Sequence, residues 1–401
     1  MTRLNDKALL PAGLRDVLPP AAAYEVEVVE RLMKTFAGHG YDRVKPPLIE
    51  FEDSLLRGSG MALSGQTFRL MDPISQRMMG VRPDITMQVA RIAATRLVKA
   101  PRPLRLSYSG QVLRVRGSQL RPERQFGQVG AEIIGTSAPM ADVEVILMAI
   151  EALAGLGLKN LSVDLGLPTL VPALSAGLEL GTATAGRLRT ALSRKDTAAV
   201  ADLADQLGKA ATRAFIAMIQ ASGPAGKALA RLDRIELPAA ARAERDALTE
   251  VVRGIEKGAP KLTLTVDPVE FRGFEYHSGV TYTFFALGVR GDLGRGGRYV
   301  AGNGVDAVTG NDGDDAGEPA TGLSLFMDTI LKALPDPVAA PRVYVPAGIA
   351  AAETKRLRGQ GWIAVVGLEP CSNPRAEARR LKCTHVVEAG QPRPLKSQKG
   401  G

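Results

Sequence analysis

Alternation of polar and apolar residues is clearest near the centre of the chain. Residues 107–115 and 126–134 are largely apolar, extended stretches. In the second stretch Gln128 and Glu132 fall on one face, and apolar residues fall on the other. A period of two predicts a half-buried strand. We therefore expect a hairpin whose polar face forms the floor of a pocket.

The periodicity of apolar residues predicts the other elements. Intervals of three and four residues indicate helices, and short runs bounded by Gly and Pro indicate strands. The expected helices span residues 21–37, 82–98, 138–156, 322–333, 350–358 and 375–381. The expected strands span residues 41–50, 161–165, 262–266, 280–286, 343–345, 363–366 and 384–387, with a hairpin over 66–81 and a glycine-rich loop over 290–299.

This order of elements predicts an α+β protein with several parts. Residues 1–168 and 257–335 would form one core, interrupted by an inserted helical subdomain over residues 169–256, which is rich in Ala, Leu and Arg. Residues 340–392 alternate strand and helix, which predicts a small α/β unit with a parallel sheet. A chain of 401 residues is too long for one simple core, so this division is expected.

Composition narrows the class of protein. A hydrophobic content of 45% indicates a globular chain, and no apolar run reaches the roughly 18 residues of a membrane span. Cys371 and Cys383 match no disulfide framework or zinc spacing, and only three histidines are present. We therefore expect a cytoplasmic protein with reduced thiols, no metal, no cofactor and no membrane partner.

The net charge of +9 invites a nucleic-acid interpretation, but the basic residues are dispersed and aromatic residues make up only 4% of the chain. Nucleic acid is therefore not the favoured partner. Anionic small molecules or an acidic partner protein explain the charge equally well.

Several charged residues have two interpretations. Asp84 precedes an expected helix, so it could cap that helix, present a carboxylate to a pocket, or do both. The glycine-rich loop with Arg295 and Arg298 is either a phosphate site or a simple hairpin tip. An anion site or a solvated basic turn would account for the arginines between the two central strands, Arg116, Arg121 and Arg124.

Four segments together resemble a class II aminoacyl-tRNA synthetase core of the histidyl type. The proline-containing stretch around Pro47 is similar to the first class motif, which forms the dimer interface in that family, and residues 114–132 are similar to the second. The run Arg-Gly-Phe-Glu-Tyr at 272–276 and the run Gly-Gly-Arg-Tyr at 296–299 resemble its two histidine signatures. The resemblance covers residues 11 to about 333 and implies an antiparallel sheet core.

The resemblance also implies a histidine site. Asp84, Thr86 and Gln128 would hold the α-ammonium group, Glu132 and Tyr276 would face the imidazole, and Arg272 would meet the carboxylate. Arg114 and His277 complete this set, His277 standing where the family has a tyrosine. A zwitterion that carries an imidazole needs acceptors at one end and a cation at the other, which these residue types provide.

Two departures affect the ATP end of the site. Thr329 stands where the third class motif has the arginine that binds the ATP γ-phosphate. In the second motif the family has Arg-His-Glu, whereas this chain has Arg-Val-Arg at 114–116, a reversal of charge. Electrostatic stabilisation carries most of adenylyl transfer, so amino-acid activation is expected to be lost.

This combination is similar to the synthetase-like regulatory subunits of ATP phosphoribosyltransferase. The resemblance implies a non-catalytic subunit that senses histidine for feedback inhibition and is required by a short-form catalytic subunit, as a homodimer within a hetero-octamer. Arg-Pro-Asp-Ile-Thr at 82–86, where synthetases have Arg-Pro-Glu-Gly-Thr, agrees with it. The alternatives are an active histidyl-tRNA synthetase and a paralogue that binds RNA without catalysis.

Overall fold

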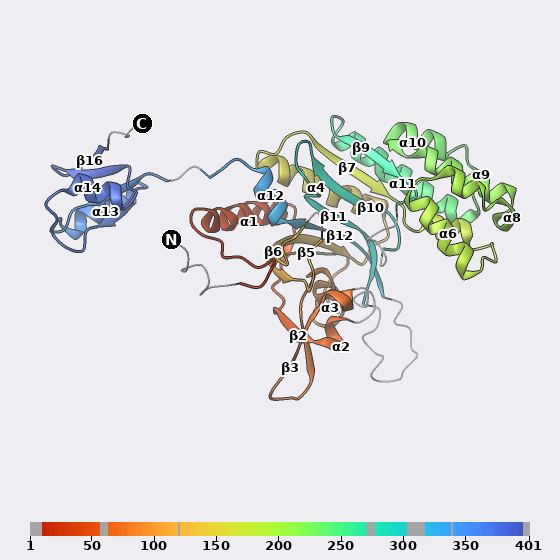
Figure 1. The fold of residues 1–401 in the computed structure, drawn as a ribbon, viewed down its shortest axis with the longest axis horizontal. Helices are drawn as coiled ribbons and strands as arrows, with labels where there is room; N and C mark the ends of the chain where they lie inside the picture. The colour runs from red at the N-terminus through yellow and green to blue at the C-terminus, as the bar shows by residue number, and fades with distance from the viewer. Residues whose placement is uncertain are drawn as a thin grey trace. The chain divides into compact units, whose positions relative to one another are not determined.

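The computed structural model describes residues 10–56, 63–118, 121–270, 277–302, 317–337 and 340–395. The chain forms two compact units, Met1–Pro335 and Asp336–Gly401 (Figure 1). Each unit has its own sheet and its own buried core.

A nine-stranded sheet organises the first unit. In spatial order its strands are β1 (Asp42–Arg43), β5 (Leu104–Leu113), β6 (Gln125–Ile134), β12 (Glu318–Phe326), β11 (Gly294–Ala301), β10 (Thr281–Ala286), β7 (Leu161–Gly166), β9 (Thr263–Asp267) and β8 (Gly223–Pro224). Neighbours from β5 to β7 pair antiparallel, whereas β1 with β5 and β7 with β9 are parallel. The expected α+β core with an antiparallel sheet is confirmed.

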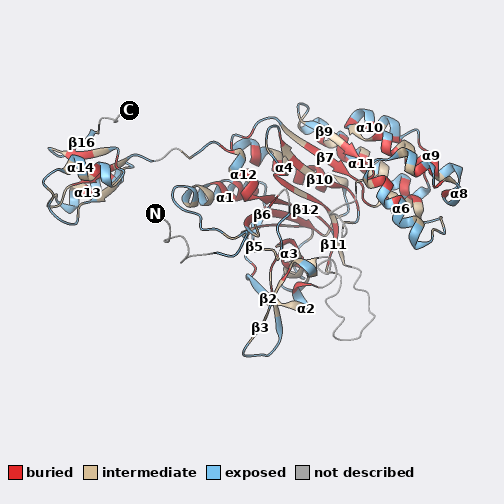
Figure 2. Ribbon diagram, in the orientation of Figure 1, coloured by how far each residue is buried: buried red, intermediate tan, exposed pale blue. Residues whose placement is uncertain are grey.

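Helices cover both faces of this sheet. The first face packs against α1 (Ala21–Gly38) and α4 (Pro139–Gly155), where Leu32 and Phe36 contact the core formed with Val129 of β6. The second face packs against α3 (Thr86–Thr95), through Val89 among others. Both faces of β6 are therefore buried (Figure 2), so the alternation of its residues is confirmed but its expected half-burial is wrong.

A small sheet of β2 (Ile49–Phe51), β4 (Met78–Val81) and β3 (Phe68–Met71) follows α1, with α2 (Glu52–Leu55) beside it. The expected hairpin over 66–81 is confirmed. The expected strand over 41–50 is instead two strands, β1 and β2, in separate sheets. The prolines between them cannot donate to a ladder, and the carbonyl of Pro47 accepts a hydrogen bond from Gln88 Nε2 at 2.8 Å.

Seven helices and the short strand β8 lie between β7 and β9 in the sequence. They are α5 (Leu170–Ser175), α6 (Thr182–Ser193), α7 (Thr197–Ala201), α8 (Ala204–Leu207), α9 (Lys209–Ala221), α10 (Ala225–Leu232) and α11 (Ala239–Gly258). Leu248 and Val252 of α11 belong to the same buried cluster as Val143 of α4. The inserted helices thus share one hydrophobic core with the sheet.

Two stretches differ from the sequence expectation. The helix expected over 322–333 begins only at α12 (Met327–Ala333), and residues 318–326 form β12. The glycine-rich stretch expected as a loop forms β11. Both strands lie inside the sheet, where pairing on two sides overrides local propensity. The Gly/Asp-rich segment that follows β11 lies outside the described residues.

The second unit has four strands in the order β14 (Ile363–Val366), β13 (Arg342–Val345), β15 (His385–Glu388) and β16 (Gln391–Pro394). The first three are parallel as expected, and β16 adds an antiparallel strand that the pattern did not predict. Separate clusters cover its two faces, one containing Leu357 of α13 (Ala351–Gly359) and the other Ala378 of α14 (Pro374–Arg380). Throughout the described ranges, no helix combines the length and apolar character needed to cross a bilayer.

A buried ion pair ties α4 to the sheet. Asp142, in the first turn of α4, is fully buried and accepts hydrogen bonds from Arg298 Nε and Thr321 Oγ1, each at 2.7 Å. Arg298 is therefore neither a phosphate-binding loop residue nor a solvated loop charge. Its side chain lies on the face of β11 that packs against α4.

We predict that Asp142→Ala lowers the free energy of unfolding by about 3–5 kcal/mol, because it leaves the Arg298 charge buried without its acceptor. The matched control is Asp53→Ala, whose ion pair with Arg77 is exposed on both sides. That variant should lose less than about 1 kcal/mol. Urea denaturation measures both, and equal losses would contradict the assignment.

Candidate functional site

A cavity of about 160 Å³ opens on the α3 side of the nine-stranded sheet. Its walls come from β6, β11 and β12, from the start of α3 and from Arg114 after β5. An apolar cavity of about 150 Å³ accommodates one benzene molecule. The volume is therefore sufficient for a ligand the size of an amino acid.

Glycines form the floor of this cavity. A Cβ atom at Gly322 would lie 1.7 Å from Glu132 Oε2, and one at Gly297 would lie 2.6 Å from Cδ2 of His277. Gly296 lies on the opposite face of β11, where a Cβ atom would lie 2.4 Å from the ring of Tyr282. Gly297 and Gly322 are directly opposite each other in the register, so two paired strand positions carry no side chain on the cavity face.

Glu132 lies at one end of the cavity on β6, and its side chain is almost completely buried. Its carboxyl oxygens accept hydrogen bonds from the hydroxyls of Tyr108 at 3.1 Å and Tyr299 at 3.0 Å. Burial raises the pKa of Glu132 to about 8, although these hydrogen bonds act in the opposite direction. The group is therefore mostly protonated at neutral pH.

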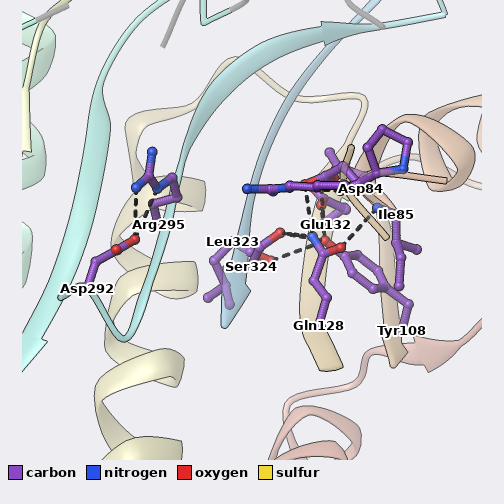
Figure 3. Close-up of polar contacts among 12 residues, drawn as sticks. Asp84, Ile85, Tyr108, Gln128, Glu132, Asp292, Arg295, Leu323 and Ser324 are labelled. Carbon is purple, nitrogen blue, oxygen red and sulfur yellow. Dashed lines mark hydrogen bonds and ion pairs between the residues drawn. The ribbon is translucent and has the colours of Figure 1, made fainter. Parts of the chain in front are cut away.

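Asp84 lies on a second wall, directly before α3 (Figure 3). Its Oδ1 accepts a hydrogen bond from the backbone N–H of Thr86 at 2.9 Å, and its Oδ2 lies 3.9 Å from Arg114 Nη2. The carboxylate thus satisfies a free amide at the helix start while it also lines the cavity. Asp84 is thus not the N-cap itself, a position that Ile85 occupies, but it binds the first helical amide and lines the cavity.

Gln128 stands behind Asp84 and is fully committed to the protein. Its Oε1 accepts a hydrogen bond from the N–H of Ile85 at 3.0 Å. Its Nε2 donates to Asp84 at 3.1 Å and to Ser324 Oγ at 2.6 Å. Gln128 therefore fixes the start of α3 and the Asp84 carboxylate against β12, and it does not itself line the cavity.

The structure brings most of the predicted site residues together. Five of them line the one cavity: Asp84, Thr86, Arg114, Glu132 and His277. Gln128 supports it from behind, and Arg272 and Tyr276 lie outside the described residues. Tyr108 and Ser324 were not among the predicted site residues, yet they bond to each other and to Glu132 and Gln128 of the predicted set. Tyr108 was detectable in principle, because it lies on an expected strand and faces Gly130 across it.

The loop arginine Arg121 is neither solvated nor free to bind an anion. It is 9% exposed, and its Nε donates to Asp328 Oδ2 at 2.9 Å, while Nη2 lies 3.6 Å from Asp292 Oδ1. Its guanidinium carbon lies 3.9 Å from the ring centre of Phe326. Two aspartates therefore neutralise it. Thr329, at the position of the γ-phosphate arginine, accepts a weak hydrogen bond from the same Arg121 at 3.4 Å.

We predict that Glu132→Gln changes how stability depends on pH. The folded protein keeps the Glu132 proton up to about pH 8, whereas the unfolded chain releases it near the ordinary carboxyl pKa. The unfolded state thus binds fewer protons across this interval, so the native protein should lose roughly 3–5 kcal/mol of stability relative to the variant between pH 5 and pH 8.

Urea unfolding at pH 5 and pH 8 measures this difference. Glu30→Gln, which alters a carboxylate with an exposed side chain, is the control and should show no such trend. A constant difference between the native protein and Glu132→Gln would show that Glu132 is ionised throughout.

Comparison with known proteins places this chain in a family. The family model described as histidyl-tRNA synthetase matches residues 13–330. The chain is 56% identical over 385 residues to the ATP phosphoribosyltransferase regulatory subunit of Paramagnetospirillum magneticum, covering 96% of this chain and 97% of that one. It is 55% identical over 384 residues to the protein of the same name from Rhodospirillum centenum, covering 96% and 95%.

Solved structures share the fold. An ATP phosphoribosyltransferase regulatory subunit/histidyl-tRNA synthetase from Bacillus halodurans C superposes with a TM-score of 0.79 at 22% identity, covering 96% of this chain and 99% of that one. Histidyl-tRNA synthetase from Nostoc superposes with a TM-score of 0.75 at 15% identity, covering 95% and 91%. The chain belongs to the family of ATP phosphoribosyltransferase regulatory subunits, which has the histidyl-tRNA synthetase fold.

Proposed function

We propose that this chain binds histidine in the cavity and communicates that state to a short catalytic phosphoribosyltransferase subunit, without activating the amino acid itself. In this proposal histidine acts as the feedback inhibitor of the first step of its own biosynthesis. The chain would act in the cytoplasm, as a homodimer within a hetero-octamer. The observation that carries the proposal is the buried Glu132 carboxyl, held in a cavity of amino-acid size.

The chemistry of the cavity supports histidine as the ligand. Glu132 can share a proton with an imidazole nitrogen, since its raised pKa lies near that of imidazole. Asp84 presents a carboxylate for the α-ammonium group, beside the Thr86 hydroxyl. Charge-assisted hydrogen bonds of this kind contribute about 1.5–3 kcal/mol each, so a few of them offset the cost of association.

The residues at the positions where a synthetase would bind ATP argue against synthetase activity. Arg121, a loop arginine that contacts Asp328 of α12, is already paired with Asp292 and Asp328. Thr329 offers no charge for a γ-phosphate, and an enzyme for adenylyl transfer depends on fixed positive charge at that position. These features favour a binding role over the alternative, an active histidyl-tRNA synthetase.

The relatives are named as regulatory subunits, which supports a catalytic partner for this chain. Feedback requires that histidine bind one state of the complex better than the other. A coupling free energy of about 1–3 kcal/mol corresponds to a 5- to 150-fold difference in the affinity for histidine between the two states of the complex. Histidine would change the activity of the partner by favouring the state that binds it better.

We predict that histidine binding takes up about one proton more with the native protein than with Glu132→Gln at pH 9. At this pH both free Glu132 and free imidazole are deprotonated, whereas the complex holds one proton between them. The glutamine variant has no carboxylate to share that proton. Calorimetry in buffers of different ionisation enthalpy measures the uptake, and equal uptake would show that the complex holds no additional proton shared between Glu132 and the imidazole.

We predict that a short-form catalytic subunit requires this chain for activity and that histidine inhibits the mixture. In the mixture with Glu132→Gln, half-inhibition should require at least tenfold more histidine, the cost of one charge-assisted bond. Inhibition that is unchanged by the substitution would place the effector site elsewhere.

The synthetase alternative has its own test. The chain alone should support no histidine-dependent exchange of pyrophosphate into ATP, with an active histidyl-tRNA synthetase as the positive control. Robust exchange would refute the non-catalytic assignment.

A further inference from the structure

Arg295 lies in the same cavity, at the end opposite Glu132. Successive side chains on a strand alternate between faces, so Arg295, Gly297 and Tyr299 of β11 lie on one face. Tyr299 donates to Glu132, and Arg295 and Tyr299 both line the cavity. Their Cα atoms are about 13 Å apart along the strand, with a glycine between them. The cavity thus runs along β11 from a carboxyl group to a guanidinium group.

The Arg295 guanidinium has a fixed orientation and spare donors. Its Nε and Nη2 donate to the same oxygen, Oδ2 of Asp292, at 3.1 and 3.0 Å (Figure 3). Asp292 is itself 8% exposed and is paired on its other oxygen with Arg121. A guanidinium carries five N–H donors, and no described residue accepts a hydrogen bond from Nη1 of Arg295. The side chain is 41% exposed, so a ligand can reach it.

Two other described arginines lie near the cavity and already contact groups of the protein, although Arg114 also lines it. Arg114 donates from Nε to the carbonyl of Pro83 at 3.2 Å, and its Nη2 is turned toward Asp84. Arg121 is paired with Asp292 and Asp328. Figure 3 shows Asp84 and Glu132 on one side of the site and Arg295 with Asp292 on the other. A zwitterionic ligand with its ammonium group at Asp84 therefore has a cation across the cavity.

We propose that Arg295 binds the carboxylate of the amino-acid ligand, and that Asp292 is a positioning residue that holds its guanidinium in place. This proposal rests on the proposed histidine site and assigns one recognition contact within it. The resemblance gave the carboxylate to Arg272, which lies outside the described residues. The described wall of the cavity provides Arg295 for the same task.

The assignment separates ligands by their anionic end. L-Histidine, its methyl ester and histamine share the imidazole and the amine, but only histidine carries a carboxylate. The full-length native protein should bind histidine about 10- to 100-fold more tightly than the other two, the range expected for one charge-assisted hydrogen bond to arginine. Arg295→Gln should remove this preference and leave the affinities for the ester and histamine unchanged.

Calorimetric titration of the three ligands into three proteins makes the test. Arg116→Gln is the matched control, since it removes one exposed arginine of the same sequence region that does not line the cavity. A preference for histidine that survives in Arg295→Gln would overturn the proposal and return the carboxylate to another cation. Circular dichroism and the thermal midpoint establish that the variant is folded.

Two further outcomes separate the proposal from its basis. If the native protein binds none of the three ligands, the proposed histidine site fails, and the role of Arg295 fails with it. If inorganic phosphate binds the native protein but not Arg295→Gln, while histidine and its ester bind equally, Arg295 is a phosphate-binding residue and the carboxylate assignment is wrong.

Asp292 is tested by the same ratio of affinities. Asp292→Asn should reduce the preference for histidine over its ester without changing the affinity for the ester, and Asp292→Glu should restore the preference. A purely structural role would instead weaken the binding of all three ligands alike.

Discussion

The carboxyl group of Glu132 is buried in the middle of a nine-stranded sheet, and a group in that position requires hydrogen-bond partners and space. The partners are the hydroxyls of Tyr108 and Tyr299, which come from strands on either side of β6. The space comes from Gly322, directly opposite in the register between β6 and β12. Burial of the Glu132 side chain therefore depends on the order of the strands, on their register and on the position of this glycine.

A second constraint acts on the charges around the cavity. Asp292 is shared by Arg121 and Arg295, so one buried carboxylate positions an arginine in the loop after β5 and another on β11. The β5–β6 hairpin therefore has two different halves. Its strand half presents Glu132 to the cavity, while Arg121 in its loop half is consumed by contacts within the protein. A residue that lines the cavity and an arginine committed to contacts within the protein therefore occur in one hairpin.

Sequence patterns predicted the elements of this site better than its geometry. The alternation in β6 correctly placed Gln128 and Glu132 on one face, because the side-chain period of a strand is a local property. The pattern could not show that Gln128 would be turned toward Ile85, Asp84 and Ser324, since those contacts depend on how α3 and β12 pack against β6. Likewise, residues 322–326 were expected to be helical, because only pairing with β6 and β11 reveals the strand.

For the charged residues too, local contacts could be predicted from the sequence, whereas contacts between distant parts of the chain could not. Asp84 next to an expected helix start was sufficient to predict its bond to the helix amide. Arg298 and Arg121 were ambiguous in the sequence, because each finds its aspartate partner far along the chain, at positions 142 and 328. Long-range pairs of this kind follow from the fold and cannot be obtained from spacing.

The glycine floor of the cavity restricts how this family member can change. Glycine is the smallest residue, so every substitution at positions 297 or 322 adds atoms where the structure has no room for them. At Gly322 the nearest atom is Oε2 of Glu132, so any side chain there would displace that carboxyl group or the strand that carries it.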